Sequence, residues 1–293
     1  MKKILIIGAT GFLGSALMHY MSSSHTVVGT TNKYLNPDNP LLFHLDATRE
    51  SDVRKILDQL KPDVVINCAG LANVDECEKR LQESFSLNTL IPSHLARSCS
   101  EHNIKFVQVS TDHFDTETNQ PKKESDVVWP INVYGRTKLE AEKHTSDLSS
   151  DALIIRTNFF GRSVRNEKTL LDWIIRSLEQ GQPLIGFTDV LFSPVNIRVL
   201  SDAILHLLQK NASGVINVSC NEVISKHRFM VMVAQTFNLP SELVRKGRSS
   251  DLETMTKRPL NLSLDNQKLR QLINWPLPSL QDMIGEVARA RSH

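Results

Sequence analysis

The sequence has little that would indicate a disulfide-bonded, metal-binding or membrane-inserted protein. Only four cysteines occur in 293 residues, with no C-x-x-C pair, and the ten histidines form no H-E-x-x-H arrangement. We therefore expect free thiols and no metal site. There is no apolar run of membrane-spanning length and no signal-peptide pattern, so we expect a cytoplasmic protein. The net charge of +2 gives no argument for nucleic acid or an anionic membrane as a partner.

Short apolar runs alternate with helical patterns through the first half of the chain. This pattern predicts strands at 4–7, 26–29, 41–45, 63–68, 105–110 and 152–156. Between them it predicts helices, among them 49–60, 74–101 with a kink at Pro92, and 134–146. Parallel neighbours need crossovers, so the alternation predicts an α/β fold with a doubly wound parallel sheet.

The first predicted strand runs into a glycine-rich turn, IIGATGFLGS. Glycines at this spacing allow a sharp turn, let phosphates contact bare backbone and let the next helix pack closely. The unpaired N–H groups of that helix favour an anion. We predict a dinucleotide pyrophosphate site in a Rossmann-type domain, made by Gly8, Thr10, Gly11, Phe12, Leu13 and Gly14. The alternative is a glycine-rich turn without a ligand.

The alternation loosens after Arg156, which suggests a second unit. We expect a dinucleotide-binding domain over 1–157, with 187–218 returning to it. Residues 158–186 and 219–293 would form a smaller α/β domain that binds substrate. Helices are predicted there at 168–180, 226–237, 265–273 and 279–291, with a further helix at 199–209 and a strand at 214–218 in the returning segment.

The residues after the second strand indicate which dinucleotide binds. An acidic residue here selects NAD, whereas this chain has Thr31, Asn32 and Lys33. Hydroxyl, amide and ammonium groups all bond a 2′-phosphate, so we predict NADPH, with NADH as an option. The alternative for Lys33 is a solvated side chain.

Further cofactor contacts are expected at the ends of the third and fourth strands. Asp46 is placed to accept from the adenine amino group, and its rival role is to cap the helix that starts near Arg49. The other residues predicted to contact the cofactor are Ala47, Cys68, Ala69, Gly70 and Asn88.

A tyrosine and a lysine four residues apart carry the predicted chemistry. Tyr134 and Lys138 share a helix face, so the ammonium is expected to lower the pKa of the phenol. Such a tyrosine can donate and accept a proton. Thr111 ends the fifth strand, where parallel strands meet the ligand, and can donate to a substrate oxygen. A Y-x-x-x-K match by chance and strand-end capping by Thr111 are the alternatives.

These motifs together resemble a known family. Gly8-x-x-Gly11-x-x-Gly14, Asn67-Cys68-Ala69-Gly70, Ser110-Thr111-Asp112 and Tyr134-x-x-x-Lys138 look like the extended short-chain dehydrogenase/reductases. The C-terminal stretch RPLNLSLD, which begins at Arg258, is most similar to the dTDP-4-dehydrorhamnose reductase group.

The resemblance implies a reaction. NADPH would deliver hydride to a keto carbon, typically C4, of a nucleotide-linked 6-deoxy sugar. Tyr134 would protonate the alkoxide, Lys138 would hold the nicotinamide ribose, and Thr111 would orient the ketone. The substrate residues would be Asn73, Asp112, His113, Asn158 and Arg258, with Arg258 on the diphosphate or, alternatively, in a surface salt bridge.

The sequence departs from the family pattern beside the sugar. His113-Phe114-Asp115-Thr116 replaces the usual Tyr-Val-Phe-Asp-Gly, and Asn158 stands where the group has a tryptophan. His113 also occupies the position of the glutamate that 4,6-dehydratases need, which disfavours a dehydratase.

Two other functions stay open from the sequence. The chain is also similar to the β-subunit of methionine adenosyltransferase, a non-catalytic NADP-binding regulator, and to nucleotide-sugar epimerases. The resemblance allows a homodimer through the helices expected at 74–101 and 134–146.

Overall fold

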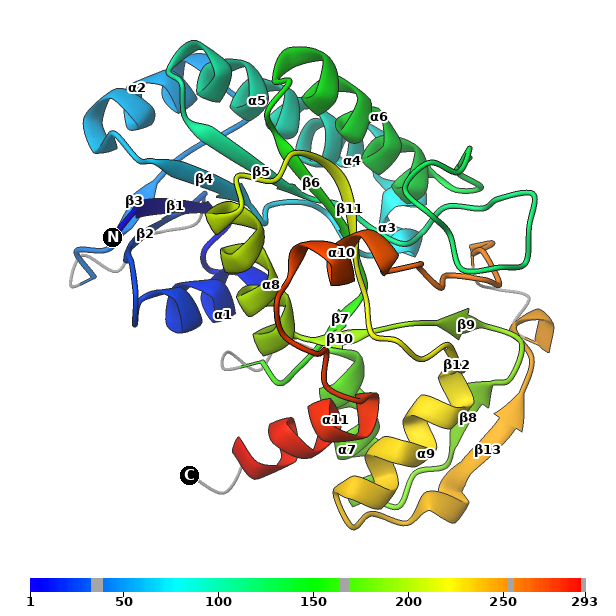
Figure 1. The fold of residues 1–293 in the computed structure, drawn as a ribbon. Coiled ribbons are helices and arrows are strands. Elements are labelled where there is room, and N and C mark those ends of the chain that lie inside the picture. The colour runs from blue at the N-terminus through cyan, green and yellow to red at the C-terminus, as the bar shows by residue number, and fades with distance from the viewer. Residues whose placement is uncertain (33–38, 164–168, 252–255, 291–293) are drawn as a thin grey trace.

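A single parallel sheet organises the chain, as the ribbon of the computed structural model shows (Figure 1). The structure describes residues 1–32, 39–163, 169–251 and 256–290. The sheet has seven strands in the order β11-β6-β5-β4-β1-β2-β3, and each neighbouring pair is parallel. The strands are β1 (Lys3–Ile7), β2 (Thr26–Thr31), β3 (Leu42–His44), β4 (Val64–Asn67), β5 (Lys105–Val109), β6 (Leu153–Thr157) and β11 (Gly214–Val218). The predicted fold class is confirmed.

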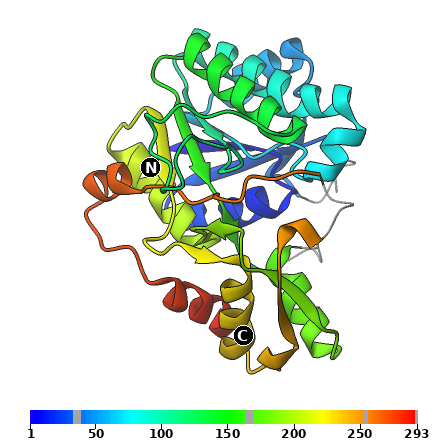
Figure 2. The ribbon, with the colours of Figure 1, turned by 90° about the vertical axis from the view of Figure 1, so that its right-hand side faces the viewer.

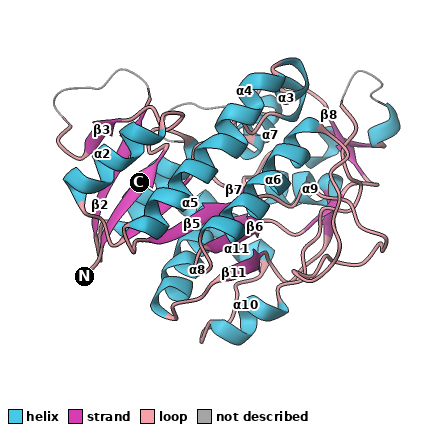
Figure 3. Cartoon of the chain, turned by 90° about the horizontal axis from the view of Figure 1, so that it is seen from above, coloured by secondary structure: helices cyan, strands magenta, loops and turns pink. Residues whose placement is uncertain are grey.

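The central strand β1 shows why its apolar run is unbroken. Ile4 and Ile6 pack into a core with α1 (Phe12–Met21) and α8 (Ile197–Gln209). Leu5 and Ile7 face the opposite core, which α2 (Glu50–Leu60) and α5 (Ile91–Glu101) cover. Successive side chains of a strand point to opposite faces, so a strand buried on both faces must be apolar throughout. Figure 3 shows α2, α5 and α6 (Val133–Leu148) lying across one face of the sheet.

The single kinked helix predicted over 74–101 is wrong. The segment is divided into α3 (Val74–Lys79), α4 (Leu81–Phe85), a π-helical turn η1 (Ser86–Leu90) and α5. The break comes at Arg80, whose φ of −123° and ψ of 58° lie outside the helical region. Pro92 lies within the first turn of α5. Proline has no N–H for an i−4 carbonyl, and the wider π turn just before it accommodates that missing bond.

The second half of the chain builds a smaller layer below the sheet (Figure 2). Three two-stranded pairs form it: β7 (Phe159–Phe160) with β10 (Val195–Asn196), β9 (Leu191–Phe192) with β12 (Ile224–Ser225), and β8 (Leu184–Phe187) with β13 (Val244–Gly247). The helices of this layer are α7 (Leu170–Glu179), α9 (Lys226–Thr236) and α11 (Leu280–Arg289), with 3-10 turns η2 (Ser241–Leu243) and η3 (Ser249–Asp251). Helix α10 (Gln267–Leu272) instead lies against β11 of the main sheet.

Strand β11 pairs with β6, and α8 packs on the face of the sheet that α1 covers. The exact domain boundaries stay a prediction. Among the helices within the described ranges, none has the length and apolar character needed to cross a membrane.

The turn between β1 and α1 leaves no room for a side chain at Gly14. A Cβ there would lie 2.2 Å from the carbonyl oxygen of Gly8 and 2.8 Å from Cα of Ala9. At Gly11 the nearest atom would be 3.4 Å away, an ordinary contact. We predict that Gly14→Ala lowers the free energy of unfolding by about 1–3 kcal/mol, because the backbone must move.

Urea denaturation measures this change, with Gly11→Ala as the matched control. The control should lose less than about 1 kcal/mol, the usual scale of a tolerated surface change. Equal losses in the two variants would contradict the close approach.

Candidate active site

The glycine loop has the shape of an anion cradle. Gly8 has a φ of 75°, and a Cβ on it would lie 2.9 Å from the backbone of Ala69. Gly11 precedes α1 without a side-chain cap from the described residues, so the first N–H groups of Phe12, Leu13 and the following turn remain available. The backbone of the glycine loop therefore lies directly against the backbone of Ala69, just after β4.

The end of β2 contacts the same loop. The hydroxyls of Thr10 and Thr31 lie 3.1 Å apart, and Asn32 follows as an exposed residue. Lys33, predicted to supply the positive charge, lies outside the described residues. Of the three residues expected to bind a 2′-phosphate, Thr31 and Asn32 lie in the described part of the chain.

Asp46 is bonded within its own loop. Its Oδ1 accepts from the backbone N and the Oγ1 of Thr48, at 3.1 and 2.6 Å, and the hydroxyl bond lowers the pKa of the carboxyl group. Helix α2 begins at Glu50 after Arg49 and has no side-chain cap from the described part of the chain. Asp46 thus makes an Asx turn and not the helix cap named as its rival role. Ala47 is buried beside it.

The loop after β4 is fixed by a side chain from the π turn. Asn88 accepts from the N of Leu71 at 2.7 Å and donates to the carbonyl of the same residue at 3.0 Å. It also donates to Oγ1 of Thr137 on α6 at 3.2 Å. A Cβ on Gly70 would lie 2.8 Å from Oδ1 of Asn88. Asn88 therefore positions the expected cofactor loop against α6.

Cys68 lies in that loop as a protonated thiol. Burial raises its pKa to about 12. A thiol with this pKa is a poor nucleophile at neutral pH, so we assign Cys68 a packing role in the loop and no chemical one.

Tyr134 and Lys138 lie on the first two turns of α6. Asn132 caps this helix by accepting from the N of Gly135 at 2.8 Å. Lys138 is buried, and its ammonium donates to the carbonyl of Val109 at 2.6 Å. The start of α6 is thereby fastened to the carboxyl end of β5, where Thr111 follows.

The expected lowering of the pKa of Tyr134 is wrong for the protein without a bound cofactor. Burial raises the pKa of the phenol to about 12, although a hydrogen bond with Thr111 opposes the shift. Burial also lowers the pKa of Lys138 to about 8, against the attraction of Glu142. A low-dielectric site disfavours the charged form of both groups, and here this effect exceeds the opposing effects of Thr111 on the phenol and of Glu142 on the ammonium.

The substrate residues predicted around Thr111 lie together. The buried carboxylate of Asp112 accepts from Nδ2 of Asn158 at 2.8 Å, across from the end of β6. The ring of His113 meets that of Tyr134 edge to face, with centroids 5.5 Å apart. Burial lowers the pKa of His113, and its Nδ1 has no partner among the described residues.

Asn73 and Arg258 both make hydrogen bonds to residues of α3. Asn73 caps α3 by accepting from the N of Glu76 at 3.0 Å. Arg258 donates to Oδ2 of Asp75 at 2.8 Å, so the salt bridge named as the alternative is formed. Its Nε is buried without a partner among the described residues, so a second binding role stays open to it.

Two lysines near Asp112 were missed by the sequence reasoning, of which Lys122 is buried and Lys226 is partly buried. Lys122 donates to the carbonyl of Asn261 at 2.5 Å, and Lys226 lies over the ring of Phe192. Burial lowers the pKa of each to about 8, while Asp112 raises both. Neither lysine belongs to a motif, and no pattern in the sequence places either one beside Asp112.

A buried ion pair supports the base of the site. Arg156 bonds both carboxylate oxygens of Glu142, with the closest contact at 2.7 Å. Ser110 donates to the same carboxylate at 2.5 Å, and the guanidinium lies 5.1 Å from the centroid of Phe114. Glu142 follows Lys138 by four residues, a spacing that could have indicated its place one turn further along α6.

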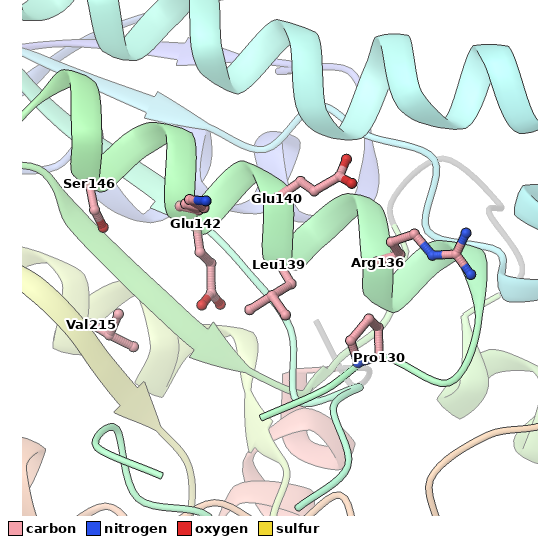
Figure 4. A pocket seen from close by; sticks show the side chains of 8 residues that line it. Pro130, Arg136, Leu139, Glu140, Glu142, Ser146 and Val215 are labelled. Atoms are coloured by element: carbon pink, nitrogen blue, oxygen red, sulfur yellow. The ribbon is translucent and has the colours of Figure 1, made fainter. Parts of the chain in front are cut away.

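A cavity of about 490 Å³ lies along α6 (Figure 4). It is lined by Pro130, Arg136, Leu139, Glu140, Glu142, Lys143, Ser146 and Val215. None of these residues was predicted for the site. The described residues also contain no group of three or more histidine, cysteine or acidic side chains that could hold a metal.

The sheet order and the glycine loop are those of Rossmann-type dinucleotide-binding proteins. The chain belongs to the RmlD substrate binding domain family, whose model matches residues 1–292. The resemblance to the dTDP-4-dehydrorhamnose reductase group is thereby confirmed.

Three relatives are similar over almost the whole chain. The probable low-salt glycan biosynthesis reductase Agl14 of Haloferax volcanii is 29% identical, over 98% of this chain and 97% of its own. The dTDP-4-dehydrorhamnose reductase of Aggregatibacter actinomycetemcomitans is also 29% identical, over 92% and 93%. The methionine adenosyltransferase 2 subunit beta of Pongo abelii is 26% identical, over 92% and 82%.

Two solved structures have the same fold. A dTDP-4-dehydrorhamnose reductase from Clostridium acetobutylicum superimposes with a TM-score of 0.87 at 25% identity, over 99% of this chain and all of that one. The Bacillus anthracis enzyme of the same name, solved in complex with NADP, gives 0.85 at 22% identity, over 99% of each chain.

The buried pair of Glu142 and Arg156 generates a stability prediction. We expect Arg156→Met to lower the free energy of unfolding by about 3–5 kcal/mol, because Glu142 is left as an unpaired buried carboxylate. Denaturant titration measures this change. The exposed pair of Glu76 and Lys79 is the control, and Glu76→Gln should cost under about 1 kcal/mol.

A second variant separates lost charge pairing from lost packing. Adding Glu142→Leu to Arg156→Met removes the unpaired charge and should recover part of the lost stability. A double variant that is less stable than Arg156→Met alone would show that packing, and not charge, explains the loss.

Proposed function

We propose that the chain is an NADPH-dependent reductase of a keto group, at C4, of a nucleotide-linked deoxy sugar. One observation carries the proposal: Tyr134, Lys138 and Thr111 converge where β5 ends. The carboxyl ends of parallel strands border the ligand crevice of such sheets. The names of two relatives, a glycan biosynthesis reductase and a dTDP-4-dehydrorhamnose reductase, support the same reaction class.

The glycine loop fits a dinucleotide. Side chains at Gly8 and Gly14 would fill the space in which backbone approaches backbone, and the start of α1 supplies free N–H groups for a pyrophosphate. The hydroxyls of Thr10 and Thr31 favour a 2′-phosphate over the bare ribose that a carboxylate would bind. These contacts support NADPH, with NADH as the weaker cofactor.

The high pKa of Tyr134 suits reduction. When bound, NADPH supplies the hydride that makes the substrate carbonyl oxygen an alkoxide. Tyr134 is protonated at neutral pH because its pKa is near 12, so its phenol has a proton to give to that oxygen. Thr111 bonds the phenol and can orient the same oxygen. Lys138 holds the nicotinamide ribose from its place beside Val109.

The substrate side supports a sugar nucleotide. Asp112 and Asn158 form a bonded polar pair next to His113, which suits sugar hydroxyls. Arg258 remains the residue proposed for the diphosphate, and it is bonded to Asp75 of α3, the helix that Asn73 caps. His113 in place of an acid supports reduction over elimination of water. A homodimer that involves α5 and α6 stays a prediction.

A regulatory subunit is the second candidate. The methionine adenosyltransferase relatives support it by likeness over the whole chain. A non-catalytic NADP-binding protein has no need of a proton donor, whereas this chain retains Tyr134 with Thr111 bonded to it. A nucleotide-sugar epimerase would retain its cofactor and consume none.

Replacement of Tyr134 tests the reductase proposal. NADPH oxidation at 340 nm is measured with a panel of nucleotide 4-keto sugars. We expect Tyr134→Phe to lower kcat by about 10²- to 10⁴-fold, the usual contribution of a general acid. NADPH affinity should change little, because the phenyl ring keeps its place.

Tyr20→Phe, on the exposed side of α1, is the matched control and should keep full activity. If the wild-type chain oxidises NADPH with none of these sugars, the reductase proposal fails. A regulatory subunit would bind NADPH without turnover, and an epimerase would convert sugars without net oxidation.

The pKa of Lys138 gives a pH dependence. The ammonium is present below a pKa of about 8 and is lost above it. We predict that kcat/KM for reduction falls as the pH rises through 8, because the lysine loses the charge that it presents to ribose and phenol. Steady-state rates between pH 6.5 and 9.5 measure this fall.

Lys138→Arg keeps its charge throughout this range and should move the decline above pH 9. Lys143→Arg, exposed on the same helix, is the control and should leave the profile unchanged. If kcat/KM of Lys138→Arg falls at the same pH as in the wild type, the fall belongs to the titration of another group.

A further inference from the structure

Lys226 begins α9 on a fixed aromatic support. Its Nζ lies 3.4 Å from the centroid of the Phe192 ring. Phe192 is fully buried and packs edge to face on Phe229, so the ring cannot give way. Antiparallel pairing of β12 with β9, at Ile224 opposite Phe192, sets this contact. The ammonium is therefore held in one place.

The charged groups that act on Lys226 come from separate parts of the chain. Asp112 attracts its ammonium and Arg258 repels it. Lys226 in turn lowers the pKa of His113. Asp112 and His113 follow β5, Lys226 is the first residue of α9, and Arg258 lies in the C-terminal stretch. Of these residues, His113 contacts the ring of Tyr134.

The ammonium of Lys226 has no anionic partner within the described residues. No carboxylate there lies within ion-pair distance of it, and the carboxylate of Asp112 already accepts from Asn158. Burial lowers the pKa of Lys226 to about 8, the expected result for a desolvated lysine without a close counter-ion. The ring of Phe192 compensates for only part of the lost hydration.

Two neighbouring groups also lack hydrogen-bond partners. Nε of Arg258 and Nδ1 of His113 are both buried and unbonded among the described residues. Buried polar atoms are nearly always bonded in folded proteins, and unbonded ones often mark a place for a ligand or an ordered water. These two nitrogens and the ammonium of Lys226 act on one another electrostatically. Of the three groups, His113 contacts the ring of the proposed proton donor, so together they indicate a site for an oxygen anion.

We propose that Lys226 binds an anionic oxygen of the substrate, with Arg258 and His113 on either side. The shared chemistry is a phosphate of a nucleoside diphosphate or a carboxylate on the sugar. The inference rests on the proposed function in placing the sugar nucleotide beside Tyr134. It adds Lys226 as a residue that contacts substrate directly.

Calorimetry on the full chain with NADPH present tests this role. The probes are UDP, dTDP, UDP-glucose and UDP-glucuronate, titrated into wild type and into Lys226→Met. Methionine keeps the length of lysine and packs well on an aromatic ring, so the fold is retained while the charge is removed. We expect affinity to fall about 10- to 100-fold, the usual effect of losing a bond to a charged group.

The probes separate the two sources of the anion. A similar loss for all four ligands assigns Lys226 to the diphosphate, and a loss confined to UDP-glucuronate assigns it to a sugar carboxylate. Lys226→Arg should restore most of the affinity. Lys210→Met, an exposed lysine after α8, is the control and should bind like wild type.

Failure of the inference can be told from failure of the reductase proposal. Unchanged affinity in Lys226→Met overturns the role of Lys226, even if the wild type is an active reductase. Wild-type protein that binds none of the four probes also overturns it. Binding that depends on Lys226 in a chain that never oxidises NADPH would leave this site standing and remove the reductase.

Discussion

The buried carboxylate of Glu142 joins the three elements that carry the proposed chemistry. It lies on α6, accepts from Ser110 after β5, and is bonded on two sides by Arg156 of β6. Each of these three residues is close in sequence to a residue of the proposed site: Lys138 is one helical turn before Glu142, Thr111 follows Ser110, and Asn158 is two residues after Arg156. The geometry of the proposed site therefore depends on an ion pair of residues that are not themselves proposed to bind substrate. Burial of such a pair costs desolvation energy. In return, the pair holds α6, the end of β5 and β6 together.

Much of the fold follows from the sequence because its signals are local. The unbroken apolar run of β1 requires two covered faces, and the alternation of strands and helices requires parallel pairing. The region between β4 and β5 was less predictable. Its helical periodicity continues through Arg80, so the pattern shows neither the break there nor the π turn that precedes Pro92.

The site was predictable where it follows a short motif and unpredictable where it depends on burial. Tyr134 and Lys138 were found by their spacing, yet the direction of the shift in the pKa of Tyr134 was not, because desolvation comes from residues distant in sequence. Lys226 lies more than a hundred residues from Asp112 and belongs to no motif. Only the folded chain brings these charges together.

The side chain of Asn88 makes the two hydrogen bonds that a neighbouring strand would make to the loop after β4. Its amide accepts from the N–H of Leu71 and donates to the carbonyl of the same residue, as a peptide group of a neighbouring strand would. The loop after β4 thus has ladder-like pairing where the sheet itself has ended. A carboxylate at this position would lack the donor, and a hydrocarbon would lack both partners. The conformation of the loop expected to border the cofactor therefore depends on the side-chain amide of Asn88, which bonds as a backbone peptide group would. The π turn η1 places this side chain against the loop.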